Sequence, residues 1–156
     1  MKKGTVSESK TTQTYLLMPP HLNAAGVLFG GQLMSWIDMM AGIVAMRHAD
    51  SKVVTVAVDH LEFKNKSYAG DVVTLEGKVT WTGNTSMEVR VDSYRENKGG
   101  ERQLINTAFL VMVALDDDGN VKKVPTLVLE TEEERKEWED GVRRNELRKM
   151  RRKEKI

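Results

Sequence analysis

The stretch that decides the fold of this 156-residue chain is Asn23 to His48, which reads NAAGVLFGGQLMSWIDMMAGIVAMRH. After Gly30-Gly31 almost every residue is apolar or small, proline is absent and few residues are β-branched, which predicts a helix. Its apolar side chains cover all sides rather than one stripe, so we expect other elements to wrap most of its circumference. The fold should therefore be built around one buried helix.

Asp38 is the only charged residue in the middle of this predicted helix. It lies too far from the helix start to act as a cap, and burying an unpaired carboxylate costs roughly several kcal/mol. Two interpretations follow. Either a neighbouring group pairs with Asp38 in the folded chain, or the carboxylate takes part in a reaction. The sequence favours the second interpretation.

Length and composition predict one cytoplasmic domain. The chain has no cysteine, so it has neither a disulfide framework nor a thiolate metal site, as is typical of reducing compartments. The first residues lack the apolar segment of a signal peptide, and no uncharged apolar run of membrane-spanning length occurs. The net charge is +1, which gives no overall field for nucleic acid. We expect no membrane and no nucleic-acid partner.

Five runs rich in β-branched and alternating apolar residues predict strands. They are Thr11 to Met18, Val53 to Phe63, Asp71 to Thr82, Thr85 to Arg95 and Arg102 to Leu115. Gly83-Asn84 is a hairpin signal between the third and fourth runs, so the last three runs should form an antiparallel meander. The polar residues 1–10 are expected to be flexible.

The C-terminal segment predicts a surface helix. Thr131 followed by Glu134 is a capping-box pattern, and the segment begins acidic and ends basic, which suits the helix dipole. From Gly141 to the end there are eight Lys and Arg residues against two Glu. This basic end is either a solvated face or a site for phosphate groups.

These elements predict an α+β domain in which a curved antiparallel sheet surrounds one helix. We place a flexible N-terminus at 1–10, the domain at 11–130 and a charged C-terminal helix at 131–156. A sheet of this size with one covering helix leaves edges to protect, which usually means self-association.

Most familiar catalytic and metal motifs are missing from the sequence. It contains no G-x-S-x-G, Walker A or H-E-x-x-H pattern, and the three histidines share no metal-ligand spacing. Asp116-x-Asp118-x-Asn120 partly matches a calcium loop, but a hairpin turn explains it better. We therefore expect no metal.

Two features of the central stretch each allow two interpretations. Glycines at Gly30 and Gly31 would let a ligand oxygen approach the free N–H groups at the positive end of the helix, or they would only permit tight packing. Asn23 precedes a glycine-containing loop, where asparagine either has a functional role or, more commonly, only forms a turn.

The run from Asn23 to Asp38, followed by Ala41-Gly42-Ile43-Val44-Ala45, resembles the signature of hotdog-fold acyl-CoA thioesterases. It is most similar to the group that includes bacterial short- and medium-chain acyl-CoA hydrolases and the animal cytosolic long-chain enzymes. The resemblance continues at the segments 54–59, 70–73, 85–88, 124–125 and 130–132, so it spans nearly the whole chain. It implies the hotdog fold, in which a five-stranded antiparallel sheet wraps a long helix.

The resemblance also implies a site. In the family, the residues at the positions of Asn23 and Asp38 are catalytic and meet across the interface of a dimer, and dimers commonly assemble as trimers of dimers. Asp38 lies about 10 Å along the predicted helix, so one chain can hardly direct both residues at one carbon atom. The resemblance places Val56-Ala57-Val58 and Thr85-Ser86-Met87 at the coenzyme A site. It also places basic residues of the last helix, Arg144 and Arg148, near the phosphates of coenzyme A.

The implied reaction is hydrolysis of fatty acyl-CoA. N–H groups near Gly30 and Gly31 would polarise the thioester carbonyl, while Asp38 deprotonates a water molecule or attacks directly to form an anhydride. Asn23 would orient the water or the carbonyl. No cofactor is expected, since coenzyme A is part of substrate and product. The alternatives are a non-catalytic acyl-CoA-binding or regulatory hotdog protein, and a hotdog dehydratase whose usual Asp/His pairing has no match here.

Overall fold

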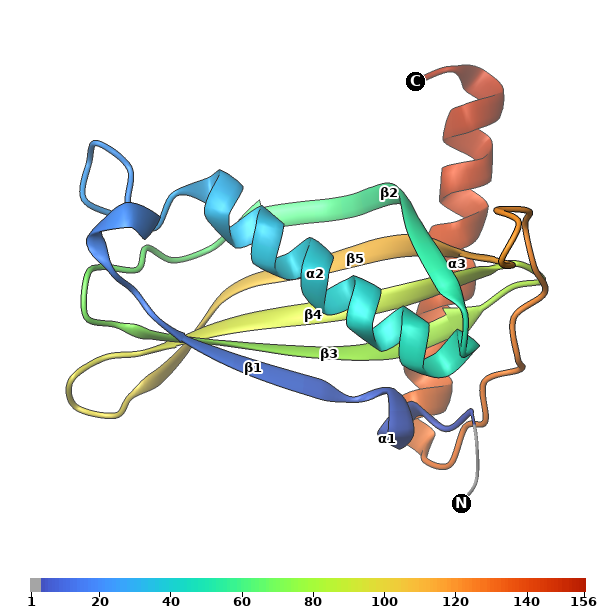
Figure 1. The fold of residues 1–156 in the computed structure, drawn as a ribbon, viewed down its shortest axis with the longest axis horizontal. Coiled ribbons are helices and arrows are strands. Elements are labelled where there is room, and N and C mark those ends of the chain that lie inside the picture. Colours follow the sequence, from blue (N-terminus) through green and yellow to red (C-terminus); the bar gives the residue numbers. More distant parts are fainter. Residues whose placement is uncertain (1–3) are drawn as a thin grey trace.

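The computed structural model of the chain describes residues 4–156 (Figure 1). Its helices are α1 (Val6–Ser9), α2 (Gly30–Ala49) and α3 (Glu132–Glu154), with a short 3-10 helix η1 at Pro19–His21. Its strands are β1 (Thr11–Leu16), β2 (Lys52–Phe63), β3 (Val72–Thr82), β4 (Ser86–Glu96) and β5 (Arg102–Leu115). Every predicted strand and both long helices are present, with ends within two residues of those expected.

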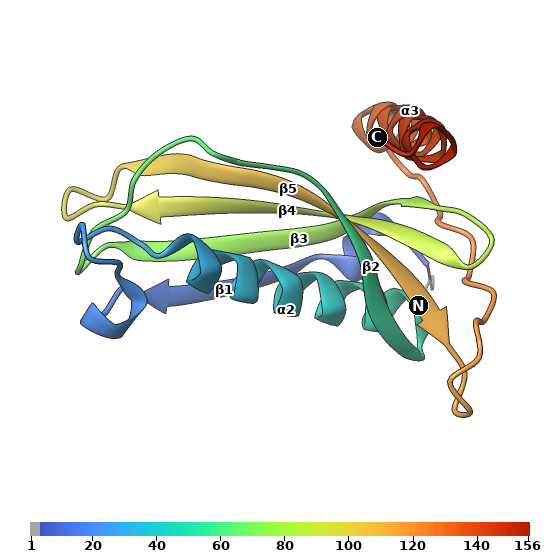
Figure 2. The same ribbon diagram turned by 90° about the horizontal axis from the view of Figure 1, so that it is seen from above.

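The strands form one antiparallel sheet in the order β1-β3-β4-β5-β2. Its centre is the predicted meander β3-β4-β5, and β1 and β2 are the two edges. Figure 2 shows the sheet curving around α2, with α3 on the opposite side. The predicted arrangement of a sheet wrapped around one long helix is confirmed.

Helix α2 buries one side against the sheet and leaves the other side open. The residues that face the sheet are fully buried in the core and include Leu33, Ile37, Met40, Ala41 and Val44. On the opposite side Ser35, Asp38, Met39 and Met46 are exposed. The prediction that other elements wrap most of the helix is therefore wrong for a single chain. The apolar pattern of a helix indicates which of its faces are buried, but it does not indicate whether the same chain or another subunit buries them.

The ends of α2 follow from local chemistry. Asp50 takes the left-handed conformation at the C-cap, with φ 51°, and its N–H donates to the carbonyl of Met46. Arg47 and His48 lie in the last turn, where cations favour the negative end of the dipole. The expected C-terminal boundary of this helix is confirmed.

The N-terminal segment is more ordered than predicted. Residues 1–3 lie outside the described residues, but the next residues form α1, capped by the Thr5 hydroxyl. Val6 packs into the hydrophobic core, and the buried Ser9 hydroxyl accepts a hydrogen bond from the Val79 N–H at 3.0 Å. A bridge between Thr5 and Val128 adds to these contacts, which together dock a segment whose composition is polar.

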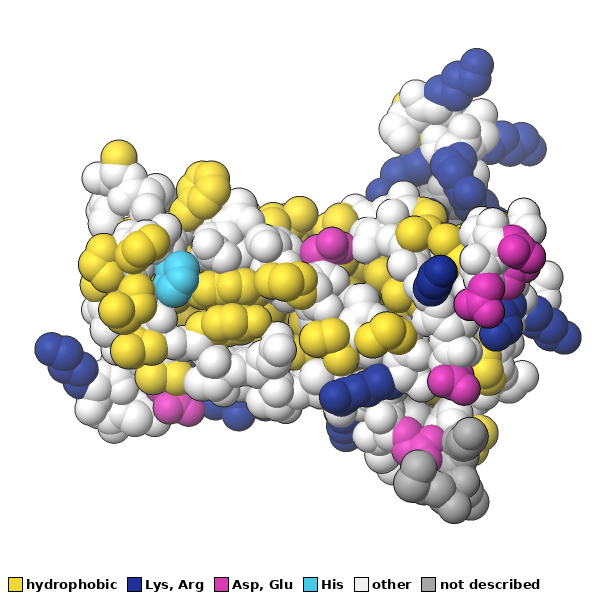
Figure 3. Space-filling view, viewed as in Figure 1, with side chains coloured by type: hydrophobic (Ala, Val, Ile, Leu, Met, Phe, Trp, Pro, Cys, Tyr) yellow, Lys and Arg dark blue, Asp and Glu magenta, His cyan; other side chains and the backbone are white. Residues whose placement is uncertain are grey.

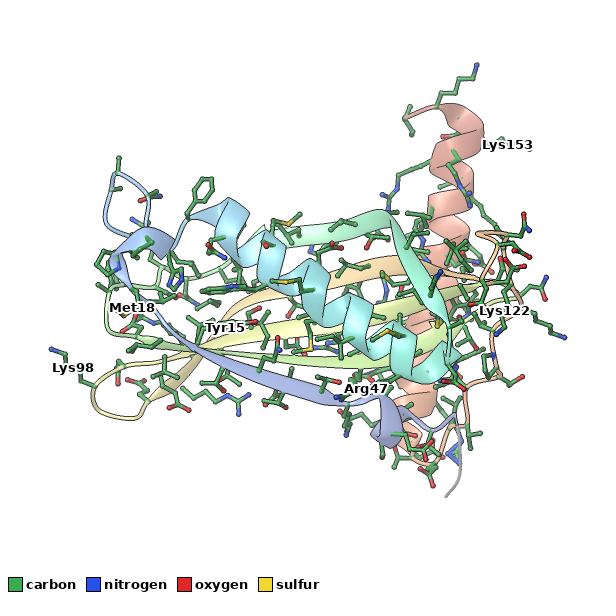
Figure 4. All side chains as sticks on the ribbon, in the orientation of Figure 1. Tyr15, Met18, Arg47, Lys98, Lys122 and Lys153 are labelled. Atoms are coloured by element: carbon green, nitrogen blue, oxygen red, sulfur yellow. The ribbon has the colours of Figure 1, made fainter. Side chains whose placement is uncertain are left out.

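Helix α3 crosses the outer face of the sheet, and its free end extends beyond β2, where Lys153 is labelled (Figure 4). The predicted capping box is present, since Thr131 and Glu134 each bond the other's backbone N–H. Gly141 allows a close approach to the sheet, because a Cβ there would lie 2.8 Å from the Cβ of Trp81. No helix in the described part of the chain is both long and apolar enough to cross a membrane.

Candidate active site

Asp38 lies on the open side of α2, and one of its two carboxylate oxygens accepts a hydrogen bond. Its Oδ1 accepts a hydrogen bond from the Thr55 hydroxyl at 2.6 Å. Within residues 4–156, Oδ2 has no hydrogen-bond partner and no cation pairs with the carboxylate. The side chain is exposed in the single chain. The carboxylate is oriented by a hydroxyl and keeps a free oxygen, which is the arrangement that a general base or a nucleophile needs.

Thr55 is a functional candidate that the sequence did not reveal. It lies on the edge strand β2, immediately before a register shift in the pairing with β5. Its hydroxyl also lies 3.4 Å from the sulfur of Met112, but the single hydroxyl hydrogen is best directed at the closer, charged oxygen. A threonine in a strand is ordinary, so only its position facing α2 distinguishes it.

The start of α2 carries free backbone donors. Phe29 is the N-cap and provides no side-chain cap, and the first bonded N–H groups are those of Gln32 and Leu33, which donate to the Phe29 carbonyl. Within the described residues the N–H groups of Gly30 and Gly31 have no partner. Such groups at the positive end of a helix form a site for developing negative charge.

The same glycines also have a packing role. A Cβ on Gly31 would lie 2.5 Å from the ring of Phe29, and one on Gly30 would lie 3.3 Å from the ring of Phe63. Both interpretations of the glycine pair are therefore compatible with the structure. The two exposed rings crowd a side chain at these positions but can shift to make room for one, and the backbone donors stay free.

Asn23 lies in the loop before α2, where it forms a turn. Its Oδ1 accepts hydrogen bonds from the N–H groups of Ala25 and Val27, at 2.9 and 3.3 Å, around Gly26 with φ 77°. The predicted turn chemistry is confirmed. The turn uses only the oxygen, and within the part of the chain that the structure describes the amide NH₂ has no partner. The exposed Asn23 side chain can therefore donate to a ligand.

The structure does not bring Asn23 and Asp38 together in one chain. The hydrogen bonds of Asn23 stay within its own loop, whereas the Asp38 carboxylate bonds only to Thr55 among the described residues. Asp38 lies eight residues after the first residue of α2, which is about 12 Å along the helix axis at roughly 1.5 Å per residue. A single chain thus presents two separate parts of the expected site.

The residues expected at the coenzyme A site differ in accessibility. Within Val56-Ala57-Val58, the two valines are exposed on the edge strand, by 55% and 41%, and the alanine is half-buried. Thr85 and Ser86 are half-buried at the start of β4. Met87 is fully buried in the hydrophobic core, so its side chain does not line an open surface.

Arg144 and Arg148 point into the sheet rather than away from it. Arg144 forms a two-pronged ion pair with the fully buried Glu88, at 2.7 and 3.0 Å. The buried Arg148 donates through Nη1 to Asp59 at 3.0 Å and to Glu88 at 3.2 Å. These contacts give both residues a structural role, which the basic composition did not indicate. Phosphate binding by them stays a prediction.

The shifted pKa values lie away from these groups. Burial raises the pKa of the Tyr15 hydroxyl, and burial followed by the charges of Asp92 and Glu76 raises that of Tyr94. The hydrogen bond to Glu76 raises the pKa of Arg102. These shifts keep both phenols neutral and Arg102 charged near neutral pH, so none of the three is a candidate for proton transfer.

Each of the three histidines has a partner that suits the structural interpretation. His21 Nδ1 accepts from the Met18 N–H, His48 Nε2 bonds the carbonyl of Pro125, and His60 lies 3.6 Å from Glu62. No group of three or more His, Cys, Asp and Glu residues within 4–156 is arranged to hold a metal ion.

Residues 25–101 match the model of the Thioesterase superfamily. An uncharacterized acyl-CoA thioester hydrolase of Bacillus subtilis is 43% identical over 92% of this chain and 84% of its own length. The cytosolic acyl coenzyme A thioester hydrolase of Mus musculus is 38% identical over 88% of this chain. The match covers only 37% of the length of that mouse protein.

Solved structures gave similar matches. An apo-hexameric acyl-CoA thioesterase superposes with a TM-score of 0.92 at 44% identity, covering 97% of both chains. An acyl-CoA hydrolase of Staphylococcus aureus in complex with butyryl coenzyme A and coenzyme A superposes with a TM-score of 0.90 at 35% identity, covering 97% of this chain and 93% of that one. Variants of the Staphylococcus enzyme change one asparagine, one aspartate and one threonine to alanine, at positions 15 and 17 residues apart.

Proposed function

The chain belongs to the thioesterase superfamily, and from this premise we propose that it hydrolyses fatty acyl-CoA to free fatty acid and coenzyme A. The observation that carries the proposal is the Asp38 carboxylate, which is exposed, held by Thr55 through one oxygen and free at the other. A water molecule or a thioester carbon can reach that free oxygen. The reaction needs no cofactor, since coenzyme A belongs to the substrate and the product.

In the proposed reaction Asp38 takes a proton from a water molecule as the water oxygen bonds to the thioester carbon. The carbon–sulfur bond then breaks, and the departing thiolate receives that proton. In the alternative route, a carboxylate oxygen of Asp38 attacks the carbon directly and the carbon–sulfur bond breaks, which releases the coenzyme A thiolate. Water then opens the resulting anhydride to give the fatty acid and the Asp38 carboxylate, and a proton from that water goes to the thiolate. In a single turnover in ¹⁸O-labelled water, label enters Asp38 only if the anhydride forms and water then attacks the carbonyl carbon of Asp38, so labelled Asp38 identifies the anhydride route.

The negative charge that develops on the thioester oxygen needs donors. The free N–H groups of Gly30 and Gly31 are suited to this role, because they lie at the positive end of α2 and need no rearrangement. The free amide group of Asn23 is suited to orient the carbonyl or the attacking water. In this proposal the donors stabilise the negative charge, and Asp38 transfers the proton.

We propose that each site combines Asn23 of one subunit with Asp38 of another. Asn23, Asp38 and Thr55 follow each other at separations of 15 and 17 residues, the same residue types and separations as the three positions changed in the Staphylococcus enzyme. The three residues therefore form one candidate catalytic set, although one chain holds only Asp38 and Thr55 together.

The exposed surface supports self-association through β2. The edge strand carries the exposed Val54, Val56 and Val58, and hydrophobic side chains gather over α2 and β2 on the face in Figure 3. An unpaired edge with apolar side chains needs a partner, and a second β2 would extend the sheet across a two-fold axis. We propose a dimer of this kind, and a trimer of dimers by analogy with hexameric relatives.

The coenzyme A moiety is proposed to lie along Val56-Ala57-Val58 and near Thr85 and Ser86, where side chains are accessible. A contribution from Met87 would have to come from its backbone. Arg144 remains a candidate for the phosphates through its Nη1, which has no hydrogen-bond partner among the described residues, whereas the buried Arg148 would have to exchange the carboxylates that it now contacts. We place the enzyme in the cytoplasm, as the name of the mouse relative states for that protein.

The test is release of free thiol from a panel of acyl-CoA esters, followed with a colorimetric thiol reagent. We expect turnover of at least one chain length and its loss in Asp38→Asn. Binding of acyl-CoA without release at any chain length would favour the non-catalytic alternative.

A further inference from the structure

Glycines inside regular elements usually have a packing reason, and Gly42 in α2 does not have one within its own chain. A Cβ on Gly77 of β3 would lie 2.9 Å from Met40 and Val44, and one on Gly141 of α3 would lie 2.8 Å from Trp81. A Cβ on Gly42 would meet no atom within 4 Å. Glycine inside a helix is less stable than alanine, so a glycine there needs a compensating reason. Since no group of the same chain uses the space beside Gly42, we look for that reason in a molecule outside the chain.

The location of Gly42 indicates which occupant. It follows Asp38 by four residues, so it lies on the same side of the helix, one turn and about 6 Å further along its axis. Met39 and Met46, three residues before and four residues after Gly42, are exposed by 51% and 50%. Met39, Gly42 and Met46 therefore form an apolar strip that begins beside the Asp38 carboxylate, and the missing side chain of Gly42 leaves a gap at its centre.

We infer that Gly42 makes room for the acyl chain of the substrate and limits which chains fit; this inference rests on the proposed function. The reaction places the thioester carbon beside Asp38, so a chain attached to that carbon has to pass over a neighbouring turn of α2. Methionine side chains are apolar and adaptable, which suits a hydrocarbon chain. They offer few partners to the amides of the pantetheine arm, which favours the acyl side over the coenzyme A side.

The variants Gly42→Ala and Gly42→Leu fill the gap in two steps, and Ser35→Leu is the matched control. Ser35 is also exposed on α2 but lies one turn before Asp38, on the other side of the carboxylate. For Gly42→Leu we expect kcat/KM to fall at least about tenfold for dodecanoyl-CoA and less than about twofold for acetyl-CoA, with Gly42→Ala between this variant and the wild type. Ser35→Leu should show no dependence on chain length.

Two further measurements keep the inference separate from the proposed function. The affinity for acetyl-CoA and dodecanoyl-CoA, measured by calorimetry, should show the same chain-length dependence even if the wild type releases no thiol. The midpoint of thermal unfolding of Gly42→Ala should not fall, because alanine favours the helix. Equal losses for both substrates would overturn the inference. So would a change in the mass of the assembly, since the gap would then belong to another subunit.

Discussion

At the scale of single residues, the candidate site depends on one hydroxyl and one carboxylate. Thr55 donates to Asp38 over 2.6 Å, which fixes the orientation of the carboxylate while the second oxygen stays open. A carboxylate with one fixed and one free oxygen can receive a proton from a defined direction. In the proposed reaction Thr55 therefore orients the carboxylate, and Asp38 accepts the proton.

Asp38→Asn should lower kcat by about a hundredfold to ten-thousandfold, because the amide has nearly the shape of the carboxylate but cannot act as a base or as a nucleophile. The affinity for acyl-CoA should change little. Steady-state kinetics and calorimetric binding give the two quantities. If circular dichroism showed an unfolded Asp38→Asn chain, Asp38 would be a structural residue instead.

Thr55→Ala should lower kcat by about tenfold to a hundredfold, whereas Thr55→Ser should keep most of the activity. Serine retains the hydroxyl that orients Asp38, while alanine removes it and leaves the carboxylate free to rotate. The comparison is made from kcat values at saturating substrate. Equal rates for the two variants would mean that the hydroxyl does not position the base.

The residues that the sequence revealed are those whose chemistry is unusual for their surroundings. A lone carboxylate in an apolar helix marks Asp38, but nothing distinguishes Thr55 from other strand threonines. The basic composition of the last helix likewise could not show that Arg148 meets Asp59, which lies 89 residues earlier in the chain. A contact between residues so far apart in the sequence depends on the tertiary fold.

At the scale of elements, α3 is attached to the sheet by ion pairs as well as by apolar packing. Arg148 joins Asp59 on the edge strand β2 to Glu88 on the central strand β4, and all three side chains are buried. Sequence periodicity predicted the strands within two residues because turn residues bound them. It predicted a surface helix with a solvated or phosphate-binding basic end for α3, because it cannot detect buried charge pairs.

Arg148→Met should destabilise the protein by about 1 to 3 kcal/mol, because it removes the buried cation that bridges Asp59 and Glu88. Among the cations of the described residues, Asp59 then keeps only the half-exposed Arg151, at 3.3 Å, and Glu88 keeps only Arg144. Arg143→Met is the control, since Arg143 is an exposed residue of the same helix and should change stability by less than about 0.5 kcal/mol. Urea unfolding measures both values. Similar small changes in the two variants would show that the buried pairs contribute little.

At the scale of the whole molecule, the single chain is an incomplete catalyst in the proposed account. Its exposed edge at β2 and the separation of Asn23 from Asp38 both require a second subunit. The sequence predicted self-association from the unprotected sheet edge, whereas the sharing of the site came from the family resemblance. The geometry of one chain is consistent with that sharing, because the two residues have separate hydrogen-bond partners.

The most direct test of the shared site is complementation between two inactive variants, Asn23→Ala and Asp38→Ala. The two chains are unfolded, mixed in equal amounts and refolded, and mass spectrometry of the intact assemblies checks that hybrids form. A hybrid dimer has one doubly damaged site and one intact site. Since about half of the dimers are hybrids, the mixture should recover about a quarter of wild-type activity. Hybrids with no more activity than the separate variants would show that Asn23 and Asp38 act within one chain, which would contradict the account.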